Sequence, residues 1–247
     1  MPFSKEMILG SSGNQGGGAF YEYQIEQSAR FDRASDSYLS YSVPSGAATD
    51  AAWTVSMWVK RGQLGIGDAT LLGNSGGWMR VKINSSDVFI AQTQTTFTSS
   101  LVLRDTTGWT HLVMNSQDAN NFKLYINGVE QTSDLTKSSV ATHRGFFYPS
   151  TTAYVGTDSG SNKQFDGYLA EVNMVYGLNK NQDDFGETKN GVWVPKEYTG
   201  SYGTYGAYLK FESASDLGND SSGNNNDWTA NNMGTDHQVL DSPTFGS

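Results

Sequence analysis

An Asn-Gly pair at Asn127-Gly128 is the feature that most constrains how this chain can fold. Asn-Gly between apolar runs is the strongest short-range signal for a β-hairpin, because a type I′ turn needs positive φ at both central residues. Before the turn, Phe122, Leu124 and Ile126 alternate with less apolar residues. The turn then places Ile126 opposite Val129, so we expect a hairpin whose register is set locally.

The same period of two, which a strand imposes on its two faces, recurs along the chain. In residues 53–60, one face carries Trp53, Val55, Met57 and Val59, which we assign to the core, and Trp58 lies on the other face. Further strands are expected at residues 28–31, 38–41, 78–83, 88–91, 109–114, 153–155 and 168–175. Short strands between turn signals predict an all-β fold, an antiparallel two-sheet β-sandwich.

Length and organisation fit one large β domain, since all-β sandwiches reach about 200–250 residues as one unit. We divide the 247 residues into a flexible, glycine-rich arm at 1–20 and a sandwich at 21–247. Within the sandwich, 177–207 is predicted to be a long, irregular, aromatic-rich loop, and 208–229 to supply strands that complete the sheets. Closure within the chain is expected, and insertion into a neighbouring subunit is the alternative.

Charge and cysteine content exclude several classes. A formal net charge of −9 and a pI near 4.7 argue against partners such as nucleic acid or an anionic membrane, for which a basic patch is expected. The sequence has no cysteine, so disulfides and thiolate chemistry are excluded. The apolar run near the N-terminus is too short for a signal peptide or a membrane span, so we expect synthesis in a host cytoplasm.

An ordered series of motifs resembles a known family. The series Trp109-x-His111-Leu-Val, Leu124-Tyr-Ile-Asn-Gly-Val129, Tyr154-Val-Gly156 and Phe165-Asp-Gly-Tyr-Leu-Ala-Glu-Val172 is similar to laminin-G-like domains of the concanavalin A-like lectin/glucanase superfamily. The resemblance covers roughly residues 28–176 and again 208–228. It implies a jelly-roll sandwich that binds glycans or proteins and is usually not an enzyme.

A second set of motifs narrows the resemblance. The set consists of Met1-Pro-Phe-Ser-Lys-Glu-Met7, Asp183-Asp-Phe-Gly-Glu187, Gly191-Val-Trp-Val-Pro195 and Asp241-Ser-Pro-Thr244. It looks like a laminin-G-like module of tailed phages, particularly marine ones, which usually belongs to virion structural or fibre proteins. The resemblance therefore implies localisation in the virion, other virion proteins as partners, and a homo-oligomer.

Catalysis is not expected. Glucanases of the superfamily resemble one another in a strand with several carboxylates, and a retaining enzyme needs its acid and nucleophile about 5–5.5 Å apart. The matching strand here, residues 170–175, carries only Glu171, followed on the same face by Asn173 and Val175. The three histidines lie in unrelated contexts, and His111 is expected to be structural. We therefore predict no catalytic residues.

Calcium is the one metal for which the sequence offers candidates, and no cofactor is expected to be required. The resemblance implies a rim calcium site, because many laminin-G-like domains bind one ion there, and calcium takes about six to eight oxygen ligands. The candidate ligands are Asp32, Asp36, Asp158 and Asp166. Since aspartate is also an ordinary turn residue, the alternative is that these side chains only stabilise turns.

Aromatic side chains outside the predicted core are the candidates for glycan or partner binding. They are Trp58, Trp78, Tyr148, Tyr198, Tyr202 and Tyr205. Large exposed aromatic side chains are uncommon without a partner. For Trp58 the alternative is that the 177–207 loop packs over it.

These observations predict a non-enzymatic virion protein, a capsid-decorating, fibre or adhesion subunit. Its sandwich would bind virion partners and surface glycans, without membrane insertion. A free-standing carbohydrate-binding lectin is the second hypothesis, and a glycoside hydrolase is a distant third.

Overall fold

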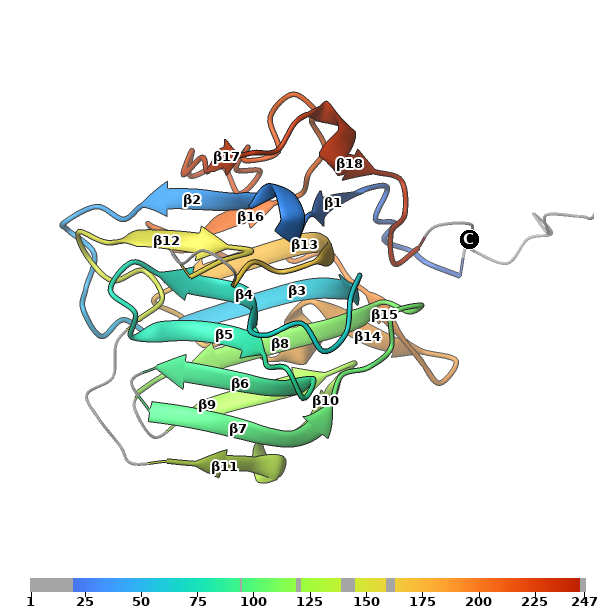
Figure 1. The fold of residues 1–247 in the computed structure, drawn as a ribbon, viewed down its shortest axis with the longest axis horizontal. Coiled ribbons are helices and arrows are strands. Elements are labelled where there is room, and N and C mark those ends of the chain that lie inside the picture. Colours follow the sequence, from blue (N-terminus) through green and yellow to red (C-terminus); the bar gives the residue numbers. More distant parts are fainter. Residues whose placement is uncertain (1–19, 94, 119–120, 139–144, 159–162, 245–247) are drawn as a thin grey trace, which may run out of the picture.

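The computed structural model describes residues 20–93, 95–118, 121–138, 145–158 and 163–244, which form two eight-stranded antiparallel sheets (Figure 1). Sheet A runs, in spatial order, β10 (Val129–Glu130), β9 (Phe122–Ile126), β8 (Thr110–Ser116), β3 (Trp53–Arg61), β13 (Gly167–Tyr176), β1 (Ser28–Phe31) and β18 (Gln238–Val239). A further strand, β16 (Ala207–Leu209), also pairs with β13. The predicted arm at 1–20 lies outside the described residues, except for Phe20.

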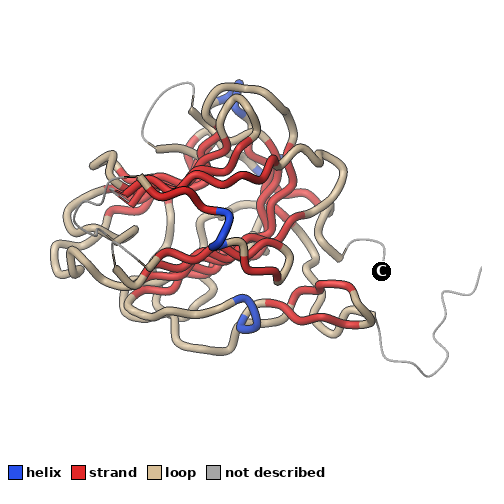
Figure 2. Tube along the Cα trace, turned by 90° about the horizontal axis from the view of Figure 1, so that it is seen from below, coloured by secondary structure: helices blue, strands red, loops and turns tan. Residues whose placement is uncertain are grey.

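Sheet B forms the second layer. Its order is β11 (Leu135–Lys137), β7 (Thr95–Val102), β6 (Val88–Thr93), β5 (Met79–Ile83), β4 (Ala69–Asn74), β12 (Thr152–Val155), β2 (Tyr38–Ser42) and β17 (Thr229–Asn231). Figure 2 shows the two sheets as two layers, so the predicted all-β sandwich is confirmed.

The remaining elements are short. A separate two-stranded sheet pairs β14 (Gly186–Lys189) with β15 (Val192–Pro195). The 3₁₀ turns are η2 (Arg33–Ser35), η3 (Thr132–Asp134), η4 (Gln182–Asp184) and η5 (Thr235–His237). None of these helices, which are all those in the described ranges, is long and apolar enough to cross a membrane.

The local hairpin is formed in the predicted register. Val129 lies opposite Ile126, and Asn127 and Gly128 both have positive φ, as a type I′ turn requires. The Asn127 side chain also accepts a hydrogen bond from the backbone N–H of His111 (2.8 Å), which fixes the turn to the start of β8. The short-range signal therefore determines this edge of sheet A.

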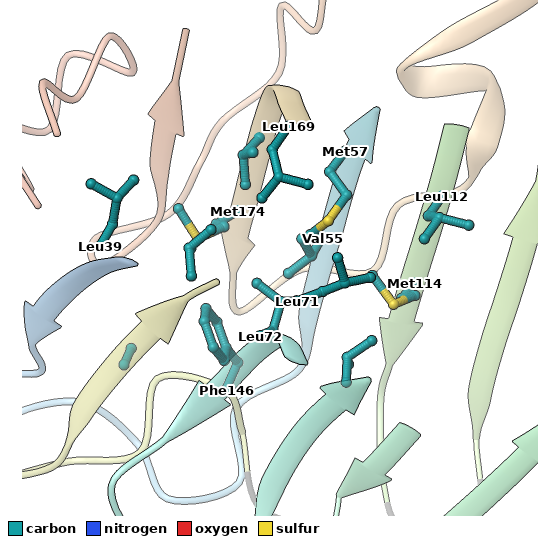
Figure 3. Close-up of a cluster of buried hydrophobic side chains, with 14 of the residues drawn as sticks. Leu39, Val55, Met57, Leu71, Leu72, Leu112, Met114, Phe146, Leu169 and Met174 are labelled. Carbon is teal, nitrogen blue, oxygen red and sulfur yellow. The ribbon is translucent and has the colours of Figure 1, made fainter. Parts of the chain in front are cut away.

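The core lies between the two sheets and follows the alternation in the sequence. Figure 3 shows Val55 and Met57 of β3 and Leu112 and Met114 of β8 pointing toward the same interior as Leu71 and Leu72 of β4. All of these side chains are fully buried. Two neighbouring residues of β4 can share the core because the register of β4 against β5 shifts between Thr70 and Leu72.

The C-terminal segment contributes β16 and β18 to sheet A and β17 to sheet B. β16 pairs with β13, and β17 pairs with β2, beside which it lies in Figure 1. Between them, Trp228 is buried and its ring stacks on Tyr41, with the centroids 5.5 Å apart. Residues 177–207 differ from the predicted irregular loop, because β14 and β15 pair there across the turn at Asn190-Gly191, both of which have positive φ.

Candidate functional site

The outer face of sheet A is covered by two chain segments, residues 20–27 and 178–206, which we call the cover. One apolar cluster joins the 178–206 segment to the sheet, and its buried members are Val113, Tyr125, Val175, Phe185, Tyr198 and Tyr202. A second cluster consists of Ile25, Trp58 and Ala170, with Tyr23, Trp109 and Trp193 packed against it. Most aromatic residues of this face therefore pack within the protein.

Trp58 is not the binding platform that the sequence predicts, because it is only 6% exposed. The ring of His111 lies against it, with the centroids 4.7 Å apart, and Nε1 of Trp193 donates to Nδ1 of His111 (2.9 Å). Nδ1 must then be unprotonated, so Nε2 donates to Ser56 Oγ (2.8 Å). Burial lowers the pKa of His111 to about 3, in keeping with this neutral form. The structure therefore shows the alternative stated for Trp58, in which the 177–207 loop packs over it through Trp193.

Of the three predicted tyrosines of the 177–207 region, Tyr198 and Tyr202 are buried and Tyr205 is half-buried. Tyr198 and Tyr202 are each 9% exposed, and their rings meet edge to face with the centroids 5.0 Å apart. Tyr202 donates to Oδ1 of Asn173 (2.6 Å), and burial raises the pKa of Tyr198 to about 12. Tyr205 is half-buried and lies edge to face against Tyr176 at 5.0 Å. The burial of Tyr198 and Tyr202 contradicts their prediction as glycan contacts.

Trp78 and Tyr148 are brought together although they are far apart in the sequence. Their ring centroids are 5.1 Å apart with an interplanar angle of 67°, and both side chains are half-buried. The Trp78 ring also lies over Gly76, where a Cβ atom would clash with it. This pair remains a predicted aromatic contact for a glycan.

Two of the four predicted calcium ligands act as turn residues. Oδ1 of Asp32 accepts a hydrogen bond from the backbone N–H of Ala34 (2.9 Å), which caps η2. Asp36 ends the same turn with φ +53°, a left-handed conformation that aspartate tolerates better than most residues. The structure thus gives both residues the role that the alternative reading assigned to them.

The other two predicted ligands are not gathered with them. Asp158 is 2% exposed and forms ion pairs with Arg80 and Lys163. The backbone carbonyl of Asp166 accepts from the N–H of Gly62 (2.9 Å). In the part of the chain that the structure describes, no group of three or more His, Cys, Asp or Glu residues could hold a metal ion. The four aspartates therefore do not fit a calcium site.

Glu171 is positioned by a β-bulge in β13. The register of β13 against β3 shifts between Ala170 and Asn173, and Glu171 has φ +51°. β1 pairs with β13 before this bulge, and β16 pairs with it after the bulge. The irregularity directs the Glu171 carboxyl toward Tyr23 of the cover and leaves the residue only 6% exposed.

Three side-chain oxygens meet at Glu171. Its Oε2 lies 2.9 Å from the hydroxyl of Tyr23 and 2.6 Å from that of Tyr208, and the two hydroxyls are 2.8 Å apart. Both hydroxyls donate to Oε2, and these two hydrogen bonds favour the ionised carboxylate. Burial opposes them and is the larger effect, so the pKa of Glu171 is raised to about 7. Glu171 thus joins the N-terminal segment and β16 to sheet A.

A polar groove of about 400 Å³ lies between the beginning of the 178–206 segment and strands β8 and β9. Its lining residues are Asn115, Gln117, Asn121, Lys123, Tyr125, Asn179, Lys180, Asn181 and Asp184. All of these side chains are polar and five of them carry amides. We call this site the amide groove.

Hydrogen bonds hold the walls of the amide groove in place. Nδ2 of Asn115 donates to the carbonyl of Lys180 (2.6 Å), which ties β8 to the cover. The backbone N–H of Asn181 donates to Oδ2 of Asp184 (3.1 Å) within a capping box at η4. The side chains of Gln117 and Asn179 are exposed and make no hydrogen bond within the described residues, so their amides are available to a ligand.

The sequence gives little warning of this groove. Residues 115–121 fall between the strand expected at 109–114 and the hairpin strand that begins at Phe122, and residues 179–184 fall within the loop expected at 177–207. The shared signal is the density of asparagine in both segments. Nothing local places the two segments side by side, since their contact depends on how the cover crosses sheet A.

Comparisons with known proteins agree with the architecture. A family model described as the concanavalin A-like lectin/glucanases superfamily matches residues 33–182. No curated protein matches the sequence. Among solved structures, a proposed carbohydrate binding protein from Bacteroides ovatus ATCC 8483 is 15% identical, with a TM-score of 0.50 over 69% of this chain and 55% of that chain. The chain thus spans about half the length of that protein.

Two other solved structures are more distant. A native heptameric SAP-like pentraxin from Limulus polyphemus is 12% identical, with a TM-score of 0.43 over 64% of this chain and 80% of that chain. Domains LG4-5 of the mouse laminin alpha1 chain are 10% identical, with a TM-score of 0.38 over 72% of this chain and 48% of that chain. At such identities, likeness to a solved structure concerns the fold alone.

Proposed function

Because the chain belongs to the concanavalin A-like lectin/glucanases superfamily, whose family model matches more than half of it, we propose that it is a non-enzymatic binding module. The ligand class that we propose is a glycan held in the amide groove. A sugar presents hydroxyl groups that both donate and accept hydrogen bonds, and a side-chain amide also does both.

The composition of the amide groove is the observation that carries this proposal. Its volume of about 400 Å³ lies within the range of about 300–1,000 Å³ that is usual for ligand sites. The amides of Gln117 and Asn179 come from two different segments of the lining, one after β8 and one in the cover. A sugar in the groove would accept and donate hydrogen bonds with both.

The surroundings of Glu171 support binding rather than hydrolysis. A retaining glycosidase needs two carboxyl groups about 5–5.5 Å apart that flank the sugar. Glu26 and Glu171 do line one cavity, but its volume is only about 130 Å³. That is well below the usual size of a ligand site, and the hydroxyls of Tyr23 and Tyr208 already contact Glu171.

We further propose that the module works in the particle of a tailed phage, as a capsid-decorating, fibre or adhesion subunit. The support is the resemblance carried by the segments 1–7, 183–187, 191–195 and 241–244. Its partners would be other virion proteins and copies of itself, with surface glycans as the ligand. A free-standing lectin would use the same groove without those partners.

Replacing the two free amides should weaken glycan binding. We expect Gln117→Ala and Asn179→Ala each to lower affinity about 5- to 10-fold for a glycan identified on an array, because each removes about 1–1.5 kcal/mol of hydrogen bonding. Titration calorimetry with the purified protein would measure this. Gln92→Ala, on the outer face of sheet B, is the matched control and should bind as the parent does. Unchanged affinity in both groove variants would refute the groove as the site.

The location in a particle has a separate test. We expect the protein in density-gradient-purified particles of the phage that encodes it, at a fixed number of copies per particle by quantitative mass spectrometry. Recovery only in the particle-free fraction would contradict the virion role and favour the free lectin. Neither result depends on which glycan binds.

A further inference from the structure

A second cavity, of about 270 Å³, opens at the end of the sandwich where β3 and β5 end and β8 begins. Its floor includes Val59, Ile83 and Leu112, which belong to the core between the sheets. At its rim, Val102 is 45% exposed. The cavity therefore opens to solvent at its rim, while the core residues of its floor stay buried.

Two guanidinium groups on the wall of this cavity share one carboxylate. Arg61, which is 4% exposed, donates from Nη1 to Oδ1 of Asp87 (2.8 Å), and Arg104 donates from Nε to Oδ2 of the same residue (3.0 Å). A hydrogen bond from the backbone N–H of Gly65 and these guanidiniums hold the pKa of Asp87 at about 2, so it stays ionised. One positive charge is left over in this trio.

Some N–H groups of the two arginines make no hydrogen bond within the described residues, which indicates that they can bind a ligand. Nε of Arg61 is buried without a hydrogen-bond partner in the structure, and the other nitrogens of Arg61 bond Leu103 O (2.7 Å) and Gln63 O (2.9 Å). Arg104 has a 64% exposed side chain, and its terminal nitrogens make no hydrogen bond within the described residues. A guanidinium with its terminal nitrogens free can bind a carboxylate through two parallel bonds.

A second carboxylate at the rim, that of Asp105, accepts hydrogen bonds from its own turn. Asp105 uses Oδ1 to accept three hydrogen bonds within its own turn, from N and Oγ1 of Thr107 (2.7 Å each) and from the N–H of Gly108 (3.1 Å). It therefore acts as a turn residue beside the cavity. Its negative charge repels an anion in the cavity, so removing that charge should strengthen the binding of an anion.

We infer that this end cavity binds a small amphipathic carboxylate, with its apolar tail in the cavity and its carboxylate on Arg104. The apolar side chains that line the cavity supply the driving force for binding the tail. The excess guanidinium at the rim selects the charge of the head group. The site is independent of the proposed glycan ligand.

Head-group exchange tests the inference. By titration calorimetry on the full chain, hexanoate should bind at least about ten-fold more tightly than hexan-1-ol or hexylamine. Arg104→Gln should reduce hexanoate binding to the level of hexan-1-ol, and Asp105→Asn should strengthen it. Arg30→Gln, on β1, is the matched control and should leave all three affinities unchanged.

Equal binding of the three head groups, absence of hexanoate binding, or full retention of it in Arg104→Gln would each overturn the inference. The amide-groove variants Gln117→Ala and Asn179→Ala should not alter hexanoate binding. Conversely, Arg104→Gln should leave glycan binding as it is. A failure of one site is thereby distinguishable from a failure of the other.

Discussion

Trp58→Ala is expected to lower the free energy of unfolding by about 3–5 kcal/mol, which is the usual range for removing a buried tryptophan from a packed core. The indole is 6% exposed and contacts the ring of His111. Its loss would leave a void beneath Trp193, whose bond to His111 fixes part of the cover. Urea denaturation followed by circular dichroism would measure the change.

The matched control is Trp78→Ala, since Trp78 is the other tryptophan that the sequence offers as a glycan contact. It is half-buried and pairs with Tyr148 near the surface, so its removal should destabilise the fold by less than half as much. If Trp58→Ala changed stability by under 1 kcal/mol while abolishing glycan binding, Trp58 would be a ligand contact after all.

Glu171→Gln is expected to change the pH dependence of stability. The pKa of Glu171 is raised by burial from its ordinary value of 4.5 to about 7, so the folded state keeps a proton that the unfolded state has lost between those pH values. The parent should therefore lose about 1.4 kcal/mol of stability per pH unit over that window, or about 3 kcal/mol in all. Glutamine stays neutral and lacks this loss.

The measurement is the difference in unfolding free energy between variant and parent, from urea titrations at several pH values. It should rise by about 3 kcal/mol in favour of Glu171→Gln between pH 4.5 and pH 7.5 and then level off. Glu187→Gln, at an exposed position of β14, is the control and should show no such rise. A constant or falling difference would mean that Glu171 is ionised in the folded protein at low pH.

The strands were predictable where their cause is local. The alternation in β3 and the Asn-Gly turn before Val129 identify both the elements and the face that each turns to the core. The motif series also resembles the right superfamily, because its residues lie in the strands common to the fold. Such features depend on neighbours within a few positions along the chain.

The candidate site was much less predictable, because it depends on contacts between distant segments. The sequence places Trp58 on the outer face correctly, but whether that face is open depends on Trp193 and on the segment that carries it. The amide groove requires residues 115–125 to meet 179–184. The bulge at Glu171 likewise lies where the pairing partner of β13 changes from β1 to β16.

The late strands β16 and β17 have a consequence for biosynthesis. While a ribosome is still translating the chain, part of the edge of β13 lacks its partner until Leu209 has emerged, and β2 lacks one neighbour until Asn231 has. Unpaired strand edges on incomplete sheets are templates for association between chains. Nascent chains that stall before residue 229 should therefore be the aggregation-prone species, and expression at a lower temperature or with a chaperone that shields these edges should raise the soluble yield.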